Sequence, residues 1–516
     1  MALAQTTSSP EMQQPAAGNA SADNSIPSGR SRLTQLIDRI GFGFLLLFAV
    51  ALPHSIKGAE RAWKIALILW MVKLAIDRAR PFKQPLAAPL LAFVTLSAVS
   101  TLLSPEPYMS LDRMKFVCLI LAGVVVAQNL KRLSQVRWLV ALLVLSGFTA
   151  ALYTGWQYTY GVGVCLAEVP ADSKLAQAGF VANDVVTAVN GHRIHTPEDL
   201  RREVGQSPAG SRVAIEYIPV RSTGRAMRTA SAEDFRESGM GTSALRFTRG
   251  RPYRAQGTLG HYVVFAEMLM QIGCMAWALM LAGQSRRWGW RLVFGVAFAG
   301  ITAALLMTET RAAVAGLVIG CLLSLLLLGK GILRWAAVGA LIVILAGATL
   351  WIQHRRGLSW VDRSDVGTQF RVLMWEDGIR LVREHPWFGV GMETVRVHFR
   401  EWNIRAFLQY HVQSHFHSTY LQIAVERGIP ALLAWLWFSI AYIVLLVRLI
   451  FRLRGQNRLA CGIATGVLAG FMAFTFTSFL HYNLGEESLA MLLFFNFGVA
   501  VAMDRMLDTP GALDVA

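Results

Sequence analysis

The sequence predicts an α-helical polytopic membrane protein with a small β-rich domain inserted among its helices. Hydrophobic residues occupy 54% of the 516 positions and charged residues only 16%, and the mean hydropathy is +0.44, so the chain is more apolar than soluble globular proteins. Apolar runs of membrane-spanning length recur along the chain. Between two of these runs, from Tyr160 onward, the sequence becomes alternating and rich in turns.

The apolar runs predict about twelve transmembrane helices. Residues 1–29, rich in Ser, Pro, Gln and Ala, lack the basic start and early apolar core of a signal peptide and are expected to form a disordered cytoplasmic tail. Five helices are expected in 30–156, four in 258–352 and three in 430–504, followed by a cytoplasmic tail at 505–516. The predicted spans lie near 35–53, 62–77, 86–103, 115–130, 137–156, 258–283, 290–308, 311–329, 335–352, 430–447, 460–480 and 488–503.

Basic residues predict the orientation of these spans. The net charge of +17 is explained first by Lys and Arg retained in cytoplasmic loops, and it does not require a nucleic-acid partner. Alternate loops are rich in basic residues, which places both termini in the cytoplasm and the long segments 157–257 and 353–429 on the other side. The basic residues of these loops are Arg30, Arg32, Arg39, Arg78, Arg80, Lys83, Lys131, Arg132, Arg137, Arg286, Arg287, Arg291, Lys330, Arg334, Arg448, Arg452, Arg454 and Arg458.

The first long segment begins with a compact β-rich module, expected at 157–222 and followed by a basic linker at 223–257. Its run from Leu175 to Gly191 resembles a PDZ domain. The resemblance implies that backbone N–H groups of a glycine-rich turn, here Gly161, Val162, Gly163 and Val164, bind the C-terminal carboxylate of a peptide that adds a strand. A module that only packs on its own membrane domain remains the alternative.

The second long segment, 353–429, concentrates Arg, His, Trp and Gly, and Arg311 starts a span on the same side. Guanidinium groups bind phosphate oxygens and stay charged, so Arg311 and Arg371 could stabilise a departing diphosphate. A histidine such as His417 could accept a proton from an attacking hydroxyl at neutral pH. Two arginines and a histidine beside a membrane therefore favour a lipid pyrophosphate as the substrate.

The same residues resemble the O-antigen ligase and polymerase superfamily of bacterial inner membranes. The resemblance is carried by Thr310-Arg311-Ala312-Ala313, Arg371, Trp375, His385-Pro386-Trp387-Phe388-Gly389-Val390-Gly391, His417-Ser418 and Gly428. It implies transfer of a glycan from undecaprenyl pyrophosphate to a hydroxyl of lipid A core, another glycan or a protein, at the periplasmic face and without metal or other cofactor. By position, His417 would activate the acceptor, Arg311 and Arg371 would hold the pyrophosphate, and His415 is a weaker substrate-binding candidate.

Other readings stay open at this point. The superfamily also includes polysaccharide polymerases and protein O-oligosaccharyltransferases, and a lipid-linked glycan transporter would bind the same substrate without reacting. His411, His415 and His417 could instead bind a divalent metal, although no Cys or acidic cluster completes such a site. The His-Glu-x-x-His and Gly-x-Ser-x-Gly patterns of metalloproteases and serine hydrolases do not occur. The five cysteines suggest no disulfide framework, and Arg311 could simply reach the membrane interface.

Overall fold

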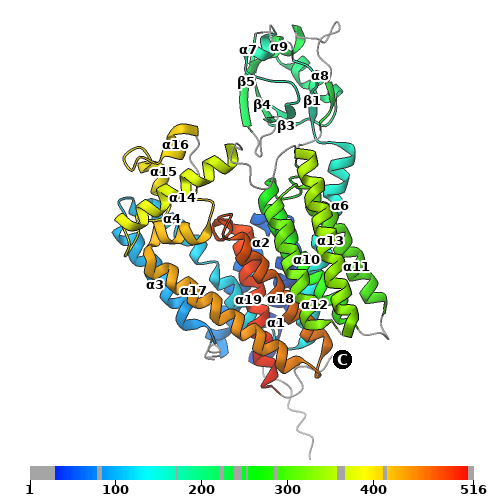
Figure 1. The fold of residues 1–516 in the computed structure, drawn as a ribbon, viewed down its shortest axis with the longest axis vertical. Helices are drawn as coiled ribbons and strands as arrows, with labels where there is room; N and C mark the ends of the chain where they lie inside the picture. Colours follow the sequence, from blue (N-terminus) through cyan, green and yellow to red (C-terminus); the bar gives the residue numbers. More distant parts are fainter. Residues whose placement is uncertain are drawn as a thin grey trace, which may run out of the picture.

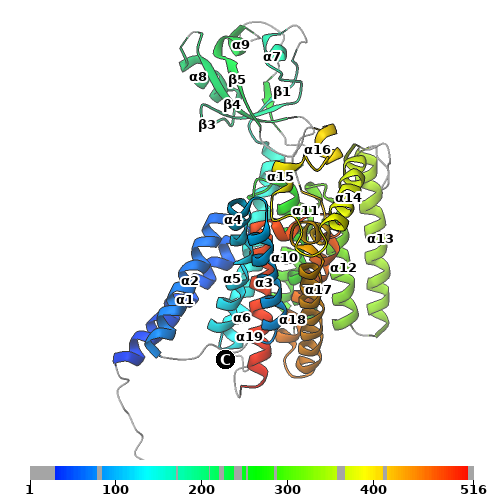
Figure 2. The same cartoon turned by 90° about the vertical axis from the view of Figure 1, so that its left-hand side faces the viewer.

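A computed structural model describes most of the chain as one bundle of helices with a small β domain at one end (Figures 1 and 2). The described residues are 29–77, 84–169, 173–208, 210–219, 226–237, 247–250, 254–283, 288–329, 331–356, 366–410 and 415–509. The fold class predicted from the sequence, a polytopic helical protein with an inserted β-rich domain, is confirmed.

Among the described residues, the first half of the bundle contains six helices and the second half contains ten helices, two of them short. The first six are α1 (Gly29–Ala51), α2 (Ile56–Asp77), α3 (Ala87–Leu103), α4 (Pro107–Val117), α5 (Ile120–Asn129) and α6 (Leu133–Tyr160). The later ones, in the described part of the chain, are α10 (Tyr262–Ala282), α11 (Trp288–Met307), α12 (Arg311–Leu328), α13 (Gly331–Arg356), α14 (Val366–Glu384), α15 (Val395–His398), α16 (Arg405–Tyr410), α17 (Thr419–Leu453), α18 (Arg458–Thr477) and α19 (Glu487–Leu507), with the 3-10 helix η2 at Asn483–Gly485.

Each of the twelve predicted spans coincides with helical residues. Eight described helices are long and apolar enough to cross a membrane, namely α1, α6, α10, α11, α12, α17, α18 and α19, and α3 is a shorter apolar helix. The predicted span 115–130 is divided between α4 and α5 by a turn at Cys118 and Leu119. Helix α17 bends at Gly428, so its first two turns belong to the polar end of the molecule and the rest to the apolar bundle.

Small residues let the central helices approach closely, as is common between helices in membranes. Gly316 and Gly320 of α12 face the backbone of α18 near Ala473 and Ala469. Gly123 of α5 and Gly498 of α19 meet at a second crossing, where a Cβ atom on Gly498 would lie 2.4 Å from the Gly123 carbonyl oxygen. Helices α10, α18 and α19 are the most deeply buried of the eight spans and form the centre of the bundle.

The small domain is an antiparallel sheet covered by short helices. Its strands are β1 (Val164–Leu166), β2 (Val185–Val189), β3 (His192–Arg193), β4 (Arg212–Ile218), β5 (Ala226–Ser231) and β6 (Phe247–Arg249), in the order β5-β4-β2-β1-β6 with β3 paired to β2. The helices are α7 (Lys174–Gln177), α8 (Pro197–Gln206) and α9 (Ala232–Glu237). Helix α8 starts with Pro197 in its first turn and Thr196 as the N-cap in a capping box with Asp199.

The predicted end of the small domain at 222 is too early. Strand β5 pairs along its whole length with β4, β6 pairs with β1, and Ala232 and Phe235 of α9 are buried in the domain core. Residues 226–237 and 247–249 of the segment expected to be a basic linker at 223–257 therefore belong to the sheet and its covering helix. Its Arg and Ser content hid these elements, because edge strands carry exposed polar side chains.

The small domain and helices α14 to α16 lie at the same end of the bundle (Figures 1 and 2). The segment 353–429 is largely helical where it is described, rather than a loop. Helix α1 begins and α19 ends at the opposite end of the molecule. The two long polar segments thus share one side, as the distribution of basic residues predicts.

Candidate active site

The predicted histidines lie together immediately before α17. The His415 and His417 rings are 4.5 Å apart, and the His417 backbone N–H donates to Nδ1 of His415 at 3.2 Å. From α14, the Phe370 ring packs edge-on against His417 at 5.7 Å. Helix α14 therefore places Phe370 beside the histidine pair, and Arg371 is the next residue of this helix.

His417 is held in a strained backbone conformation. Its φ of +48° lies in the left-handed region, which costs a residue other than glycine on the order of 1–3 kcal/mol. The following residues secure this turn: Ser418 caps α17 by accepting the Leu421 N–H, and the Thr419 N–H donates to the carbonyl oxygens of Ser478 and His481. Strain of this kind persists where the surroundings impose it and is frequent at active sites.

Burial and neighbouring charges keep both imidazoles neutral. Burial, then His415, Arg371 and His481, lowers the pKa of His417 to about 2. Burial, then His481, His261 and Arg396, lowers the pKa of His415 to about 4. The Arg371 guanidinium is thus close enough to His417 to disfavour its protonated form, and His417 carries a free lone pair at neutral pH.

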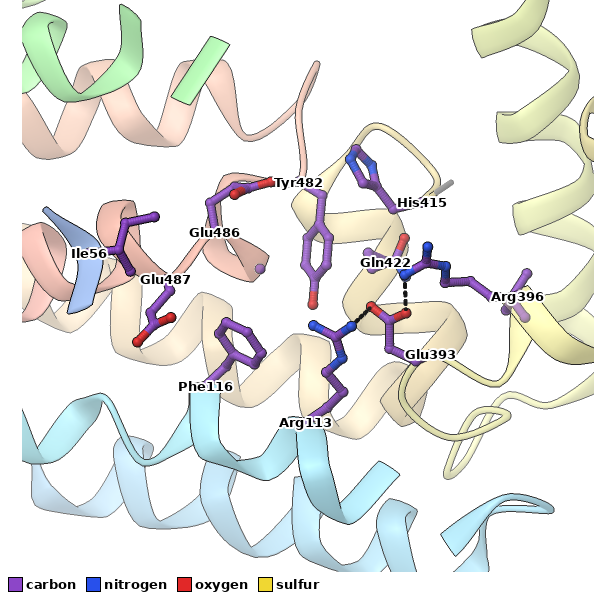
Figure 3. Close-up of a pocket in the computed structure, with 12 residues that line it drawn as sticks. Ile56, Arg113, Phe116, Glu393, Arg396, His415, Gln422, Tyr482, Glu486 and Glu487 are labelled. Atoms are coloured by element: carbon purple, nitrogen blue, oxygen red, sulfur yellow. Dashed lines mark hydrogen bonds and ion pairs between the residues drawn. The ribbon is translucent and has the colours of Figure 1, made fainter. Parts of the chain in front are cut away.

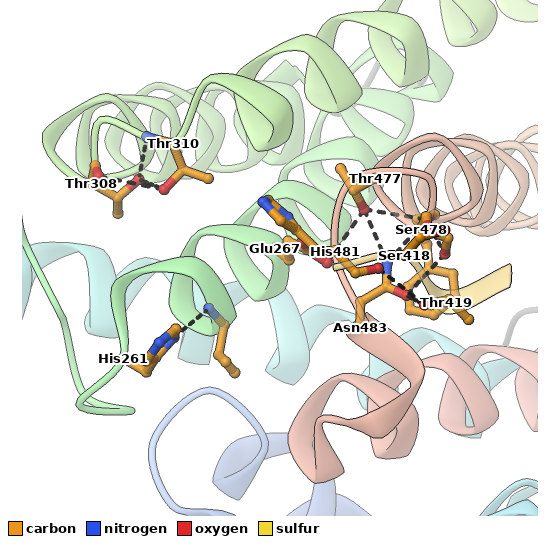
Figure 4. Close-up of polar contacts among 12 residues, drawn as sticks. His261, Glu267, Thr308, Thr310, Ser418, Thr419, Thr477, Ser478, His481 and Asn483 are labelled. Carbon is orange, nitrogen blue, oxygen red and sulfur yellow. Dashed lines mark hydrogen bonds and ion pairs between the residues drawn. The ribbon is translucent and has the colours of Figure 1, made fainter. Parts of the chain in front are cut away.

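Arg311 lies at the same end of the bundle as the histidines. It is the first residue of α12, which runs antiparallel to α18 with Gly316 beside Ala473 and Thr477. The preceding Thr308 and Thr310 are buried and bonded to each other (Figure 4). The structure therefore brings Arg371, His415 and His417 together and places Arg311 at the same level of the bundle.

A second pair of ionisable residues beside the histidines was not predicted. His481 Nδ1 lies 2.5 Å from Glu267 Oε1, and the Glu267 side chain is completely buried in α10. Thr477 donates to the other Glu267 oxygen at 3.3 Å (Figure 4). The sequence did contain a signal for Glu267, though not for its partner, because a carboxylate inside an apolar span is costly and usually functional.

A hydrogen-bonded polar layer connects α18 to the start of α17. Asn483 Oδ1 accepts from Thr419 Oγ1 at 2.8 Å and from Ser478 Oγ at 2.9 Å, and its amide donates to Thr477 Oγ1 at 3.1 Å (Figure 4). Because buried polar groups with satisfied partners are rigid, this layer fixes the turn that contains His417.

Gly389 of the 385–391 segment and Gly428 of α17 lie where the backbones of these two segments contact each other. Gly389 and Gly428 both have positive φ, and a Cβ atom on Gly428 would lie 2.2 Å from the Trp387 carbonyl oxygen. Val390 and Gly391 donate their N–H groups to the carbonyl oxygens of Val425 and Glu426 at 2.9 Å. This contact docks the 385–391 segment onto the first turns of α17, which explains why both motifs need glycine.

The metal site left open as an alternative and the predicted peptide site remain to be considered. Among the described residues, no group of three or more His, Cys, Asp or Glu side chains could hold a metal ion, and His411 lies outside the described residues. The carboxylate-binding role of Gly161–Val164 stays a prediction. In this structure the Val162 N–H donates to the Gly250 carbonyl oxygen at 2.5 Å, and β1 is paired on both sides, so no further strand can add beside Val164.

Comparison with known families agrees with this arrangement. The O-antigen ligase family matches residues 294–436, which include Arg311, Arg371, His415 and His417. The PDZ domain family matches residues 167–218. A search of curated proteins found no significant match. The chain therefore combines an O-antigen ligase domain, built from α11 to the first half of α17, with a PDZ domain inserted before it.

Proposed function

We propose that this protein transfers a glycan from undecaprenyl pyrophosphate to an acceptor hydroxyl at the outer face of the bacterial inner membrane. The observation that carries the proposal is the clustering of Phe370, His415 and His417 at the polar end of the bundle, within the residues that match the O-antigen ligase family. The charge of Arg371 acts on His417 at this place and helps to lower its pKa. In this orientation both chain termini lie in the cytoplasm and the PDZ domain lies in the periplasm.

His417 would act as the general base. It accepts the proton of the acceptor hydroxyl while the hydroxyl oxygen forms a bond to the anomeric carbon of the donor. The bond between this carbon and the diphosphate oxygen breaks, and its electron pair leaves with the lipid diphosphate. Attack from the side opposite the leaving group inverts the anomeric carbon, which the linkage in the product would reveal.

Arg311 and Arg371 would bind the diphosphate. Guanidinium groups stabilise the negative charge that develops on the leaving oxygen, and one preorganised donor of this kind is typically worth about 2.7–4 kcal/mol. The bound diphosphate would also counteract the effect of Arg371 on His417. Its negative charge raises the pKa of the imidazole, so the base becomes stronger when the donor is in place.

Reconstitution tests the proposal. The purified chain in vesicles receives an undecaprenyl-pyrophosphate glycan and, separately, lipid A core, a second lipid-linked glycan or a protein acceptor, and mass spectrometry identifies the product. A glycosylated acceptor supports a transferase, and its identity separates a ligase from a polymerase or a protein glycosyltransferase. Movement of the lipid-linked glycan across the bilayer without any glycosylated product would instead establish a transporter.

A further inference from the structure

A cavity of about 380 Å³ lies next to the candidate active site. Its walls come from the start of α2, from α4, from α15 and the turn before it, from the start of α17, and from η2 and the start of α19 (Figure 3). His415 belongs to its wall, and the His415 ring is in contact distance of the His417 ring at 4.5 Å. The described residues that line the cavity do not include Arg311 or Arg371.

A charged triad forms one wall of this cavity. Glu393 lies between two arginines, with Oε1 at 3.5 Å from Arg113 Nη2 and Oε2 at 2.9 Å from Arg396 Nη1 (Figure 3). Glu393 has a φ of +65°, and its N–H donates to the buried Glu426 carboxylate at 2.9 Å. Arg113 and Glu393 are 280 positions apart, so a strained backbone and a buried acceptor hold this carboxylate where two distant segments meet.

The charges and rings of the cavity select the ligand class. Both arginines share Glu393, and Glu486 and Glu487 add two more carboxylates, so acidic groups outnumber guanidinium groups. An excess of carboxylates disfavours a phosphate or diphosphate. Tyr482, Phe116 and Ile56 supply apolar surface, and the Tyr482 hydroxyl points toward Arg113 (Figure 3).

A sugar satisfies both features. Each sugar hydroxyl is a donor and an acceptor, so it pairs with carboxylates, guanidinium groups and the Gln422 amide at the same time. The faces of sugar rings are apolar and pack on rings such as those of Tyr482 and Phe116.

We propose that this cavity binds the uncharged, hydroxyl-rich end of the acceptor glycan and presents one of its hydroxyls to His417 past the shared wall at His415. The inference rests on the proposed function for the direction of transfer. The binding of an uncharged glycan can be measured whether or not the protein transfers glycans. The donor diphosphate would then lie on the side of Arg371, and the acceptor on the side of Arg396.

Saturation-transfer NMR on the full chain in nanodiscs tests the binding. The probes are a panel of neutral gluco-, galacto- and manno-oligosaccharides, with mannose 6-phosphate as the charged probe. Arg396→Gln removes one member of the triad, and Arg400→Gln, an exposed arginine two residues beyond the same short helix, is the matched control. We expect a neutral probe to bind the wild type and Arg400→Gln equally, and Arg396→Gln at least about tenfold more weakly.

A second pair of variants controls for misfolding. Arg113→Gln should weaken the same probe, whereas Lys115→Gln, whose ammonium pairs with Asp112 on the outside of α4, should not, and melting temperatures identify any variant that fails to fold. The inference is overturned if the wild type binds no neutral probe, prefers mannose 6-phosphate, or is matched in affinity by both Arg396→Gln and Arg113→Gln.

The transfer assay separates the two proposals. Acceptor KM raised about tenfold in Arg396→Gln, with the donor KM unchanged, supports both. Transfer that proceeds normally in both cavity variants refutes the acceptor site and leaves the transferase intact. If a neutral sugar binds in a way that depends on Arg396 and Arg113 but no acceptor is glycosylated, the proposed transferase activity is refuted and the proposed sugar-binding cavity is supported.

Discussion

The polar end of the helix bundle and the small β domain bury very different side chains. In the bundle, Glu267, Glu426 and Arg427 are almost inaccessible to solvent. The hydrophobic core of the small domain contains residues such as Leu175, Phe180 and Phe235. Its buried Asp184 accepts the Val181 N–H in a local turn, and its ion pairs, for example Arg202 with Asp199, lie at the surface.

This difference suggests that the buried charges of the polar end serve the reaction, whereas the core of the small domain serves stability. Burying charged groups costs several kcal/mol per ion unless partners compensate, so a protein retains them where they serve a function. An apolar core like that of the small domain stabilises a fold without further purpose. We therefore expect catalysis to depend on the polar end and to be largely independent of the small domain.

The largest effect is expected for His417→Ala. Loss of the general base should reduce transfer by about 10²–10⁴-fold, while binding of the lipid-linked donor is retained. His385→Ala is the matched control, because His385 belongs to the same domain but is exposed. Transfer rates in vesicles measure the effect, and an active His417→Ala enzyme would remove the proposed base.

Arg371→Gln should follow, with a loss of about 10²–10³-fold, equivalent to about 2.7–4 kcal/mol of transition-state stabilisation. The exposed Arg383 lies on the same helix, and Arg383→Gln should stay within about twofold of the wild type. Single-turnover kinetics with saturating donor separate the chemical step from donor binding. Equal rates for the two variants would exclude Arg371 from charge stabilisation.

Glycine substitutions compare the stability of the two regions. Gly428→Ala should destabilise the polar end by about 3 kcal/mol or more, because positive φ and a clash with the Trp387 carbonyl act together. Gly455→Ala, with positive φ and open space, should cost about 1–2 kcal/mol. In the small domain, Gly163→Ala meets a carbonyl oxygen at 2.2 Å and Gly191→Ala meets open space.

Melting curves and transfer rates together read out these four variants. We expect Gly428→Ala to lower both the melting temperature and the activity. Gly163→Ala should unfold the small domain and spare transfer to a simple acceptor. A Gly163→Ala protein that loses transfer while its helix bundle remains folded would show that the two regions are coupled.

Acid should destabilise the polar end. The pKa values of His415, His417 and His261 are lowered in the folded state, chiefly by burial, so below about pH 6.5 the unfolded chain binds more protons. Stability is therefore lost as the pH falls from 6.5 toward 4, by up to about 1.4 kcal/mol per histidine and pH unit. Melting temperatures at pH 7.5 and 5.0 should differ less in His417→Gln than in the wild type or His385→Gln.

The smallest effect is expected from removal of the small domain. Val162 and Gly250 are joined by a hydrogen bond of 2.5 Å, so a short Gly-Ser linker can replace 163–249. We expect transfer to a defined soluble glycan to change by less than about threefold, with any larger loss confined to acceptors or partners that the PDZ domain recruits. A general loss of transfer with an intact bundle would contradict the separation of the two regions.

The sequence predicted the helices well and the contacts between them poorly. Span positions follow from local apolar length, and the order of Arg311, Arg371 and His417 was sufficient to propose a shared site. The Glu267–His481 pair joins residues 214 positions apart, and the triad at Glu393 joins α4 to the turn before α15. Neither could be predicted from one chain, because helix packing sets these distances.

The sequence alone therefore determined that the chain crosses a membrane, that a β-rich module interrupts it, and which arginines and histidine face the same side. Only the tertiary structure decided that β5 and β6 complete the small domain, that His417 is strained and neutral, and that a carboxylate-rich cavity adjoins it. The physical reason is range: hydropathy and turn residues act over a few positions, whereas pKa values and cavities arise from groups that folding brings together from distant parts of the chain.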